Sequence, residues 1–142
     1  MATRSTVSFG GLPRQYRDPA RSAISIIPVP YDRTSTWKKG ADRGPAALLE
    51  ASANMELYDI PTRSEVYRHG IHTLPPIRHR GTPDTLADRV QAVVAEAFEA
   101  NRFPVVLGGE HSVSIGAFRA AAAAHRDLSF LQIDAHADTR ET

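Results

Sequence analysis

Hydrophobic residues gather in three short runs, and each run has the pattern of a buried β-strand. Residues 22–29 (SAISIIPV), 103–107 (FPVVL) and 128–133 (LSFLQI) are rich in apolar and β-branched side chains. Such runs are typical of strands that are covered on both faces, as in a parallel sheet. Pro28 and Pro30 are expected to end the first strand. The pattern therefore predicts three buried parallel strands.

Three further segments have the pattern of helices. Residues 44–54 begin with Gly-Pro, and proline is favoured in the first turn of a helix. A second helix is expected after Thr82, because apolar residues recur there at helical spacing, namely at Leu86, Val90, Val93, Val94, Ala97 and Phe98. Residues 112–125 are rich in alanine and form the third predicted helix. Strands that alternate with helices predict right-handed βαβ units, with helices on both faces of the sheet.

The remaining segments are polar or interrupted by proline. Residues 1–21 carry four arginines and are expected to form an arm over the surface without regular structure. Residues 55–58 are a candidate for a short segment paired with the sheet, and residues 66–76 are expected to be an extended connection. We therefore divide the chain into an arm, 1–21, and one α/β unit, 22–142.

Composition narrows the range of functions. The 142 residues fit one domain of ordinary size. Lys and Arg number 17 and Asp and Glu number 16, so the net charge of +1 gives no basic surplus for nucleic acid or an anionic membrane. The chain has no cysteine and no apolar run of membrane-spanning length. We expect a soluble, cytoplasmic protein in which any metal is held by His, Asp or Glu.

Two polar clusters directly follow predicted strands. The sequence GGEHS occupies residues 108–112, after the strand 103–107, and DAHAD occupies residues 134–138, after the strand 128–133. The carboxyl ends of parallel strands lie at one edge of the sheet, which is where ligands of such sheets bind. Both clusters are therefore expected at the same edge, where they can form one site.

The residue types in these clusters are metal ligands. In an extended chain Asp134, His136 and Asp138 point to the same side, and His111 from the neighbouring strand end is a candidate fourth ligand. Carboxylates and imidazoles without sulfur suit Mn²⁺, Fe²⁺, Zn²⁺ or Mg²⁺. An Asp-x-His pair in a loop is also common as plain surface polarity, and this alternative remains open at this point.

Other residues of the chain can be interpreted as supporting or structural. Glu110 either supports a metal ligand or is an acid favoured by the N-terminus of the following helix, and we prefer the supporting role. The two glycines before it allow a sharp turn and a close approach of the backbone. Asp32 is interpreted as a turn former. Trp37 belongs either to local packing or to the mouth of a pocket.

Three segments together resemble the ureohydrolase family, which contains the arginases and agmatinases. The segments are PVPYDRTSTWKKGADRGPAALLEAS, GGEHS and DAHAD, in the order and at separations typical of that family. The resemblance covers about residues 22–142, and the first segment is most similar to bacterial and archaeal agmatinases. It implies a three-layer α/β/α fold with a central parallel sheet, incomplete in this chain.

The resemblance also implies roles for individual residues. It places two Mn²⁺ ions in the complete active site, with His111 and Asp138 on one ion and His136 on the other. Asp134 would bridge both ions. Glu110 stands where arginases have an aspartate. The implied reaction is hydrolysis of a guanidinium group to urea and an amine, with agmatine giving putrescine.

Members of the family are roughly twice as long as this chain. Their second half supplies further metal ligands, the acid/base histidine and a glutamate that holds the substrate, so the catalytic residues beyond the metal ligands are unknown here. We expect the N-terminal part of an agmatinase-like enzyme that forms homo-oligomers when complete, with 4-guanidinobutyrate or arginine as alternative substrates. The chain alone is expected to aggregate, to bind at most one ion weakly and to be inactive. The alternative is that the 142 residues act as a non-catalytic module.

Overall fold

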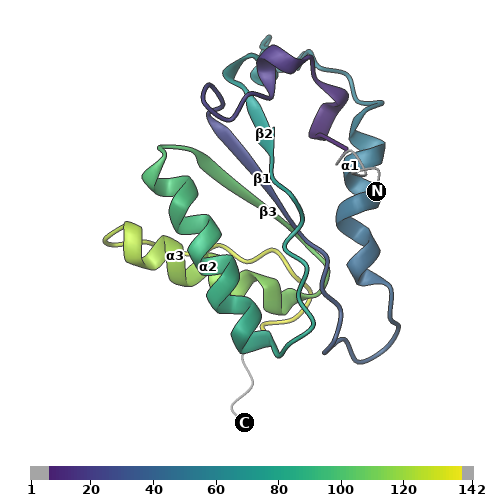
Figure 1. Cartoon of the computed structure of the whole chain (residues 1–142), viewed down its shortest axis with the longest axis vertical. Helices are drawn as coiled ribbons and strands as arrows, with labels where there is room; N and C mark the ends of the chain where they lie inside the picture. The colour runs from purple at the N-terminus through teal and green to yellow at the C-terminus, as the bar shows by residue number, and fades with distance from the viewer. Residues whose placement is uncertain (1–6, 139–142) are drawn as a thin grey trace, which may run out of the picture.

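The computed structural model describes residues 7–138, which form a three-layer α/β/α arrangement around a parallel sheet (Figure 1). The strands are β1 (Ile24–Val29), β2 (Ile71–Thr73) and β3 (Phe103–Gly108), in the spatial order β2-β1-β3. In Figure 1, helix α1 (Gly44–Ser52) lies on one face of the sheet, whereas α2 (Pro83–Glu99) and α3 (Ser114–Ala124) lie on the other. The predicted fold class and the helices on both faces are confirmed.

Strand β1 forms the centre of the sheet and contributes to two hydrophobic cores. Ile27 and Val29 pack with Leu86 and Val90 of α2 on one face. Ile26 points to the other face, where its cluster comprises Leu12, Leu49 and Ile71. Alternation of side chains along an extended strand explains why one strand serves both layers. The apolar run of β1 is continuous because both faces of this strand are buried, as the sequence predicted.

Pro28 lies within β1 and does not end it, contrary to the prediction. It pairs with Leu107 in the register of β1 and β3. The carbonyl of Pro28 accepts from the Ile77 N–H at 2.8 Å, on the side of the sheet where β2 has already ended at Thr73. In an extended residue the N–H and C=O point to the same side, so the missing proline donor faces a position without a strand.

Helix α2 agrees with its sequence signals. The side chain of Thr82 accepts from the Thr85 N–H at the first turn, and Pro83 occupies the first helical position. Its buried residues are Leu86, Ala87, Val90, Val94 and Ala97. Helices α1 and α3 are also confirmed, although a 3₁₀ helix, His111–Val113, precedes α3 where the prediction began the helix. Within residues 7–138, no helix combines the length and the apolar character that a membrane span needs.

The described part of the predicted arm contains regular structure. Two 3₁₀ helices, Phe9–Gly11 and Arg14–Tyr16, lie within it. Leu12 between them is 3% exposed and belongs to the core on the α1 face. The expectation of a surface arm without regular elements is therefore wrong for residues 7–21, because Leu12, with Phe9 and Tyr16 beside it, packs the segment against the core. Residues 1–6 lie outside the described residues.

Two connections also differ from the prediction. Residues 55–58 do not pair with the sheet, and the nearby bridge between Asp59 and Ser64 is isolated and antiparallel. The stretch 66–76, predicted as an extended connection, contains the 3₁₀ helix Val66–His69 and then strand β2. A strand of three residues is too short to show the alternation by which strands are recognised.

The predicted strand at residues 128–133 is absent from the described structure. These residues are irregular and exposed, and Leu131 and Ile133 are 87% and 91% exposed. Phe130 instead packs against Phe118 of α3, with 4.5 Å between ring centroids. An apolar run predicts a strand only where neighbouring elements bury it, and here the run has no hydrogen-bonded partner strand among residues 7–138.

Candidate metal centre

The polar segments that follow β1 and β3 lie side by side. Val29 at the end of β1 pairs with Gly108 at the end of β3. The β1–α1 loop, residues 30–43, leads to the helix on one face, and residues 109–113 lead to the helix on the other. The chain thus leaves these two neighbouring strands in opposite directions. Such a switch point is the common ligand-binding place of open α/β sheets.

Three predicted metal ligands meet at this edge. His111, Asp134 and Asp138 each place a ligand atom within 4.8 Å of the others. Nδ1 of His111 lies 2.6 Å from Oδ2 of Asp138 and 3.6 Å from Oδ2 of Asp134. One imidazole nitrogen and two carboxylates form a donor set that divalent cations such as Mn²⁺, Mg²⁺ or Zn²⁺ accept. The residues present therefore fit a divalent cation.

His136 lies on the other side of Asp134. Its Nδ1 is 3.6 Å from Oδ1 of Asp134, whereas Oδ2 of the same carboxylate faces His111. Asp134 therefore stands between the two histidines, and its side chain, at 23% exposed, is the least exposed of the four predicted ligands. His136 is not one of the three residues that converge.

The segment 134–138 is bent, so the predicted extended alternation does not hold. Oδ1 of Asp134 accepts from the His136 N–H at 3.0 Å, which closes a turn two residues along the chain. Asp138 has a positive φ of 52°, in the left-handed region. The turn and the left-handed residue bring Asp134 and Asp138 toward His111 while His136 points elsewhere.

The histidine and the aspartates at this edge favour one another's charged forms. The hydrogen bond with Asp138 raises the pKa of His111 above its ordinary value, and burial offsets this only partly. The His136 N–H lowers the pKa of Asp134, with a smaller contribution from the nearby His111. Asp134 is therefore ionised at neutral pH. A cation and a proton would compete for Nδ1 of His111, which makes cation binding dependent on pH.

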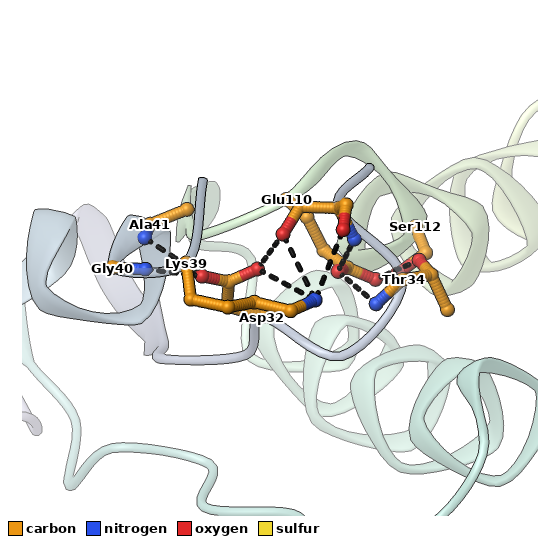
Figure 2. A network of polar contacts seen from close by, with 8 residues as sticks. Asp32, Thr34, Lys39, Gly40, Ala41, Glu110 and Ser112 are labelled. Carbon is orange, nitrogen blue, oxygen red and sulfur yellow. Dashed lines mark hydrogen bonds and ion pairs between the residues drawn. The ribbon is translucent and has the colours of Figure 1, made fainter. Parts of the chain in front are cut away.

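Glu110 does not contact a predicted metal ligand through its carboxylate. The residue is 7% exposed, and its side chain accepts from Thr34, Ser35 and Ser112 (Figure 2). Burial alone raises the pKa of Glu110, but hydrogen bonds from Ser112, Thr34 and Ser35 outweigh it and bring the pKa below its usual value. Glu110 is therefore a supporting residue, but its carboxylate supports the β1–α1 loop and not a metal ligand.

Asp32 organises the other half of the same loop. Its carboxylate accepts from the backbone N–H groups of Gly40 and Ala41 and from the hydroxyl of Ser35. Nζ of Lys39 lies 3.7 Å from Oδ1 of Asp32 (Figure 2). The prediction that Asp32 forms a turn is confirmed, although the turn it closes reaches nine positions along the chain, to Ala41.

Gly109 permits the close approach predicted for the two glycines. A Cβ on Gly109 would lie 2.1 Å from the carbonyl oxygen of Tyr31. The Gly109 N–H donates to Val29 and the Glu110 N–H donates to Tyr31, at 3.2 and 3.0 Å. The backbone after β3 is therefore fixed to the start of the β1–α1 loop.

Comparison with known proteins identifies the family. The sequence profile of the arginase family matches residues 22–142. The chain belongs to the arginase family. The resemblance inferred from GGEHS, DAHAD and the upstream segment is thereby confirmed.

Several curated relatives of this arginase-family chain have ureohydrolase names. It is 33% identical over 129 residues to the N(1)-aminopropylagmatine ureohydrolase of Synechocystis sp., covering 86% of this chain and 42% of the relative. It is 32% identical over 126 residues to the agmatinase of Bacillus cereus, covering 85% and 42%. The chain thus spans about two fifths of the length of these relatives.

Solved structures support the arginase-family fold. The agmatine ureohydrolase of Thermoplasma volcanium superposes with a TM-score of 0.67 at 27% identity, over 71% of this chain and 34% of that one. A protein described as an agmatinase from Clostridium difficile gives a TM-score of 0.68 at 18% identity, over 75% and 39%, and supports the fold alone. The α/β sheet that carries the candidate metal centre is therefore shared with these structures.

Proposed function

We propose that this chain is part of a metal-dependent ureohydrolase, which cleaves a linear guanidino compound into urea and an amine. The observation that carries the proposal is the convergence of His111, Asp134 and Asp138 at the carboxyl ends of the strands of an arginase-family sheet. The imidazole and carboxylate donors suit a divalent cation, and their place at a switch point suits a binding site.

The proposed cofactor is Mn²⁺, with two ions in the complete centre. His111 and Asp138 would hold one ion and His136 the other, and Asp134 would lie between them because its two oxygens face the two histidines. When bound, such ions supply Lewis acidity, which activates water at neutral pH and stabilises charge on the group under attack.

Charge balance indicates that the centre needs further ligands. Two divalent ions carry four positive charges, against the two negative charges of Asp134 and Asp138. We propose that additional carboxylates and the acid/base group come from sequence outside these 142 residues. The share of the relatives' length that this chain spans, about two fifths, supports that proposal.

Agmatine is the proposed substrate, with putrescine and urea as products. The names of the relatives, agmatinase and N(1)-aminopropylagmatine ureohydrolase, support a guanidino compound with a linear amine tail. Aminopropylagmatine, 4-guanidinobutyrate and arginine are the alternatives. They share the guanidinium group and differ only in the tail.

The experiment measures urea release with Mn²⁺ from these four compounds. It uses the 142-residue chain and the product of the complete reading frame that contains it. We expect release by the longer protein, greatest with agmatine, and none by the 142-residue chain. Asp134→Asn should abolish release, whereas Asp127→Asn, at an exposed position away from the cluster, should leave it unchanged. Absence of urea from all four compounds in the longer protein would contradict the proposed function.

A further inference from the structure

We propose that Glu110 is a positioning residue, which holds the β1–α1 loop at the metal-binding edge so that the loop forms one wall of the substrate site. The proposal rests on the proposed function, since a wall has a role only where a substrate binds. The proposal assigns a role to Glu110, which is not a metal ligand, and to residues 30–43, which contain none of the proposed ligands.

The carboxylate of Glu110 is fully used. Its Oε2 accepts from the backbone N–H groups of Thr34 and Ser35 at 2.6 and 2.9 Å. Its Oε1 accepts from the hydroxyl of Ser112 at 2.6 Å and from the hydroxyl of Thr34. Hydrogen bonds to an ionised, buried carboxylate are among the stronger ones in proteins. Three of the four donors belong to the β1–α1 loop, so the carboxylate acts on the loop more than on its own turn.

Ser35 connects Glu110 to the rest of the loop. Its N–H donates to Glu110 and its hydroxyl donates to Asp32, while its carbonyl accepts from Nζ of Lys39 at 3.0 Å. Asp32 in turn accepts from the N–H groups at the far end of the loop, as Figure 2 shows for Gly40 and Ala41. The carboxylates of Asp32 and Glu110 therefore hold the loop in a closed conformation. Of the two, Glu110 fixes the loop to the segment after β3.

The position of the loop favours a role at the substrate site. Glu110 precedes His111 directly in the chain, and β1 and β3, which the two segments follow, are paired to their last residues. The tip of the loop, residues 36–38, takes no part in the network and is exposed, with Trp37 at 89%. The network therefore fixes the loop without using its tip, which stays available to the tail of a substrate held at the edge.

Trypsin measures the hold of Glu110 on the loop, because Lys38 and Lys39 are cleavage sites within it. In Glu110→Gln the single amide oxygen can satisfy only part of the four donors. We expect cleavage after Lys38 and Lys39 of the 142-residue chain to become at least tenfold faster. Glu50→Gln, at an exposed position on α1, is the matched control and should cleave at the original rate.

Two outcomes of this experiment would overturn the proposal. One is cleavage in Glu110→Gln within twofold of the control. The other is an equal acceleration at Arg89 in α2, since that would mean that Glu110 supports the whole fold and not the loop. Thr34→Val removes one donor and leaves Glu110 in place, so it decides the question if Glu110→Gln fails to fold. We expect a threefold acceleration, and an unchanged rate would count against the proposal.

Steady-state kinetics of the urea-releasing protein tests the substrate wall. Glu110→Gln should raise KM for agmatine at least tenfold, with kcat within threefold and the Mn²⁺ content unchanged. A fall in kcat at constant KM, or loss of Mn²⁺, would overturn the assignment. Absence of urea release by the unmodified protein would instead overturn the proposed function, and the trypsin rates would still show whether Glu110 holds the loop.

Discussion

Gly109 and Tyr31 approach so closely that a Cβ on Gly109 would stand 2.1 Å from the Tyr31 carbonyl oxygen. This contact joins the backbone after β3 to the start of the β1–α1 loop. The obstacle is backbone, which cannot rotate away as the end of a side chain can.

Gly109→Ala should therefore destabilise the protein. Forcing the two segments apart strains the hydrogen bonds that Val29 and Tyr31 accept, and overpacking of this kind costs about 1–3 kcal/mol. Urea denaturation measures the loss. Gly44→Ala is the control, because a Cβ there meets Gly108 at an ordinary 3.7 Å. Equal stability of the two variants would contradict the close approach.

Asp32 should make the loop sensitive to acid. The hydroxyl of Ser35, and then the N–H of Gly40, lower the pKa of Asp32, whose side chain is 3% exposed. A carboxyl with a lowered folded-state pKa contributes stability above its unfolded pKa of about 3.9, and this stability is lost as the pH falls through the folded value. Trypsin is inactive in acid, so pepsin digestion between pH 2 and 5 is the measurement.

In that digestion the loop of the unmodified protein should open as the pH falls below 4. Asp32→Asn should be cut rapidly at every pH, because its amide accepts fewer of the loop's donors. Asp127→Asn should behave as the unmodified chain does. A loop that stays protected at pH 2, or an Asp32→Asn loop as resistant as the original at pH 5, would show that Asp32 does not hold it.

Metal binding by the 142-residue chain should be weak and limited to one ion. His111, Asp134 and Asp138 converge, whereas His136 does not, and the donors of one ion are incomplete. Calorimetric titration with Mn²⁺ should give a stoichiometry no greater than one. Asp134→Asn should abolish the signal and Asp127→Asn should preserve it. Two tightly bound ions per chain would show that the ligands have been assigned wrongly.

The exposed apolar segment 128–133 should drive self-association of this chain. Leu131 and Ile133 are almost fully exposed, and Phe103 at the open edge of β3 is 69% exposed. Replacing both Leu131 and Ile133 by Lys should lower the associated fraction in sedimentation velocity at equal concentration. The free energy of unfolding should change by less than about 0.5 kcal/mol, as is usual for surface positions.

Leu86→Ala supplies the contrast for that double variant. Leu86 lies on the buried face of α2 and is 0% exposed, so its truncation should cost about 2–5 kcal/mol without reducing association. If the double lysine variant lost as much stability as Leu86→Ala, the segment 128–133 would have to be packed in the folded chain.

The sequence predicted best the elements whose signals are local. Thr82 and Pro83 mark the start of α2, and the apolar face of that helix begins at Leu86. The contact between Glu110 and Thr34 was missed, because it joins residues 76 positions apart and neither residue has a pattern that names the other. A long-range hydrogen bond depends on the pairing of β1 with β3, which composition and periodicity do not specify.

Three of the four residues predicted as metal ligands lie close together in the structure, whereas His136 does not, and the local geometry of the segment was not predicted. His111 follows β3 as predicted, whereas Asp134 and Asp138 reach it from an irregular segment that stands in place of the predicted strand. The extended alternation failed because an Asx-type turn at Asp134 and the left-handed φ of Asp138 bend the chain, and an aspartate adopts such conformations without a marker in the sequence. The prediction of a strand at 128–133 was wrong, because an apolar run indicates a preference for burial but does not specify the element that buries it.

Pro28 sets the width of the sheet beside the candidate site. If β2 were extended by two or three residues, one of its carbonyls would face the ring of Pro28 and find no donor. Among residues 7–138 the sheet is therefore three strands wide at its amino end and two strands wide at its carboxyl end, where the Ile77 N–H donates to the Pro28 carbonyl. Pro28, together with Pro75 and Pro76 after β2, thus leaves the position beside the end of β1 to a connecting segment, in which the Gly81 carbonyl accepts a hydrogen bond from the Tyr31 hydroxyl.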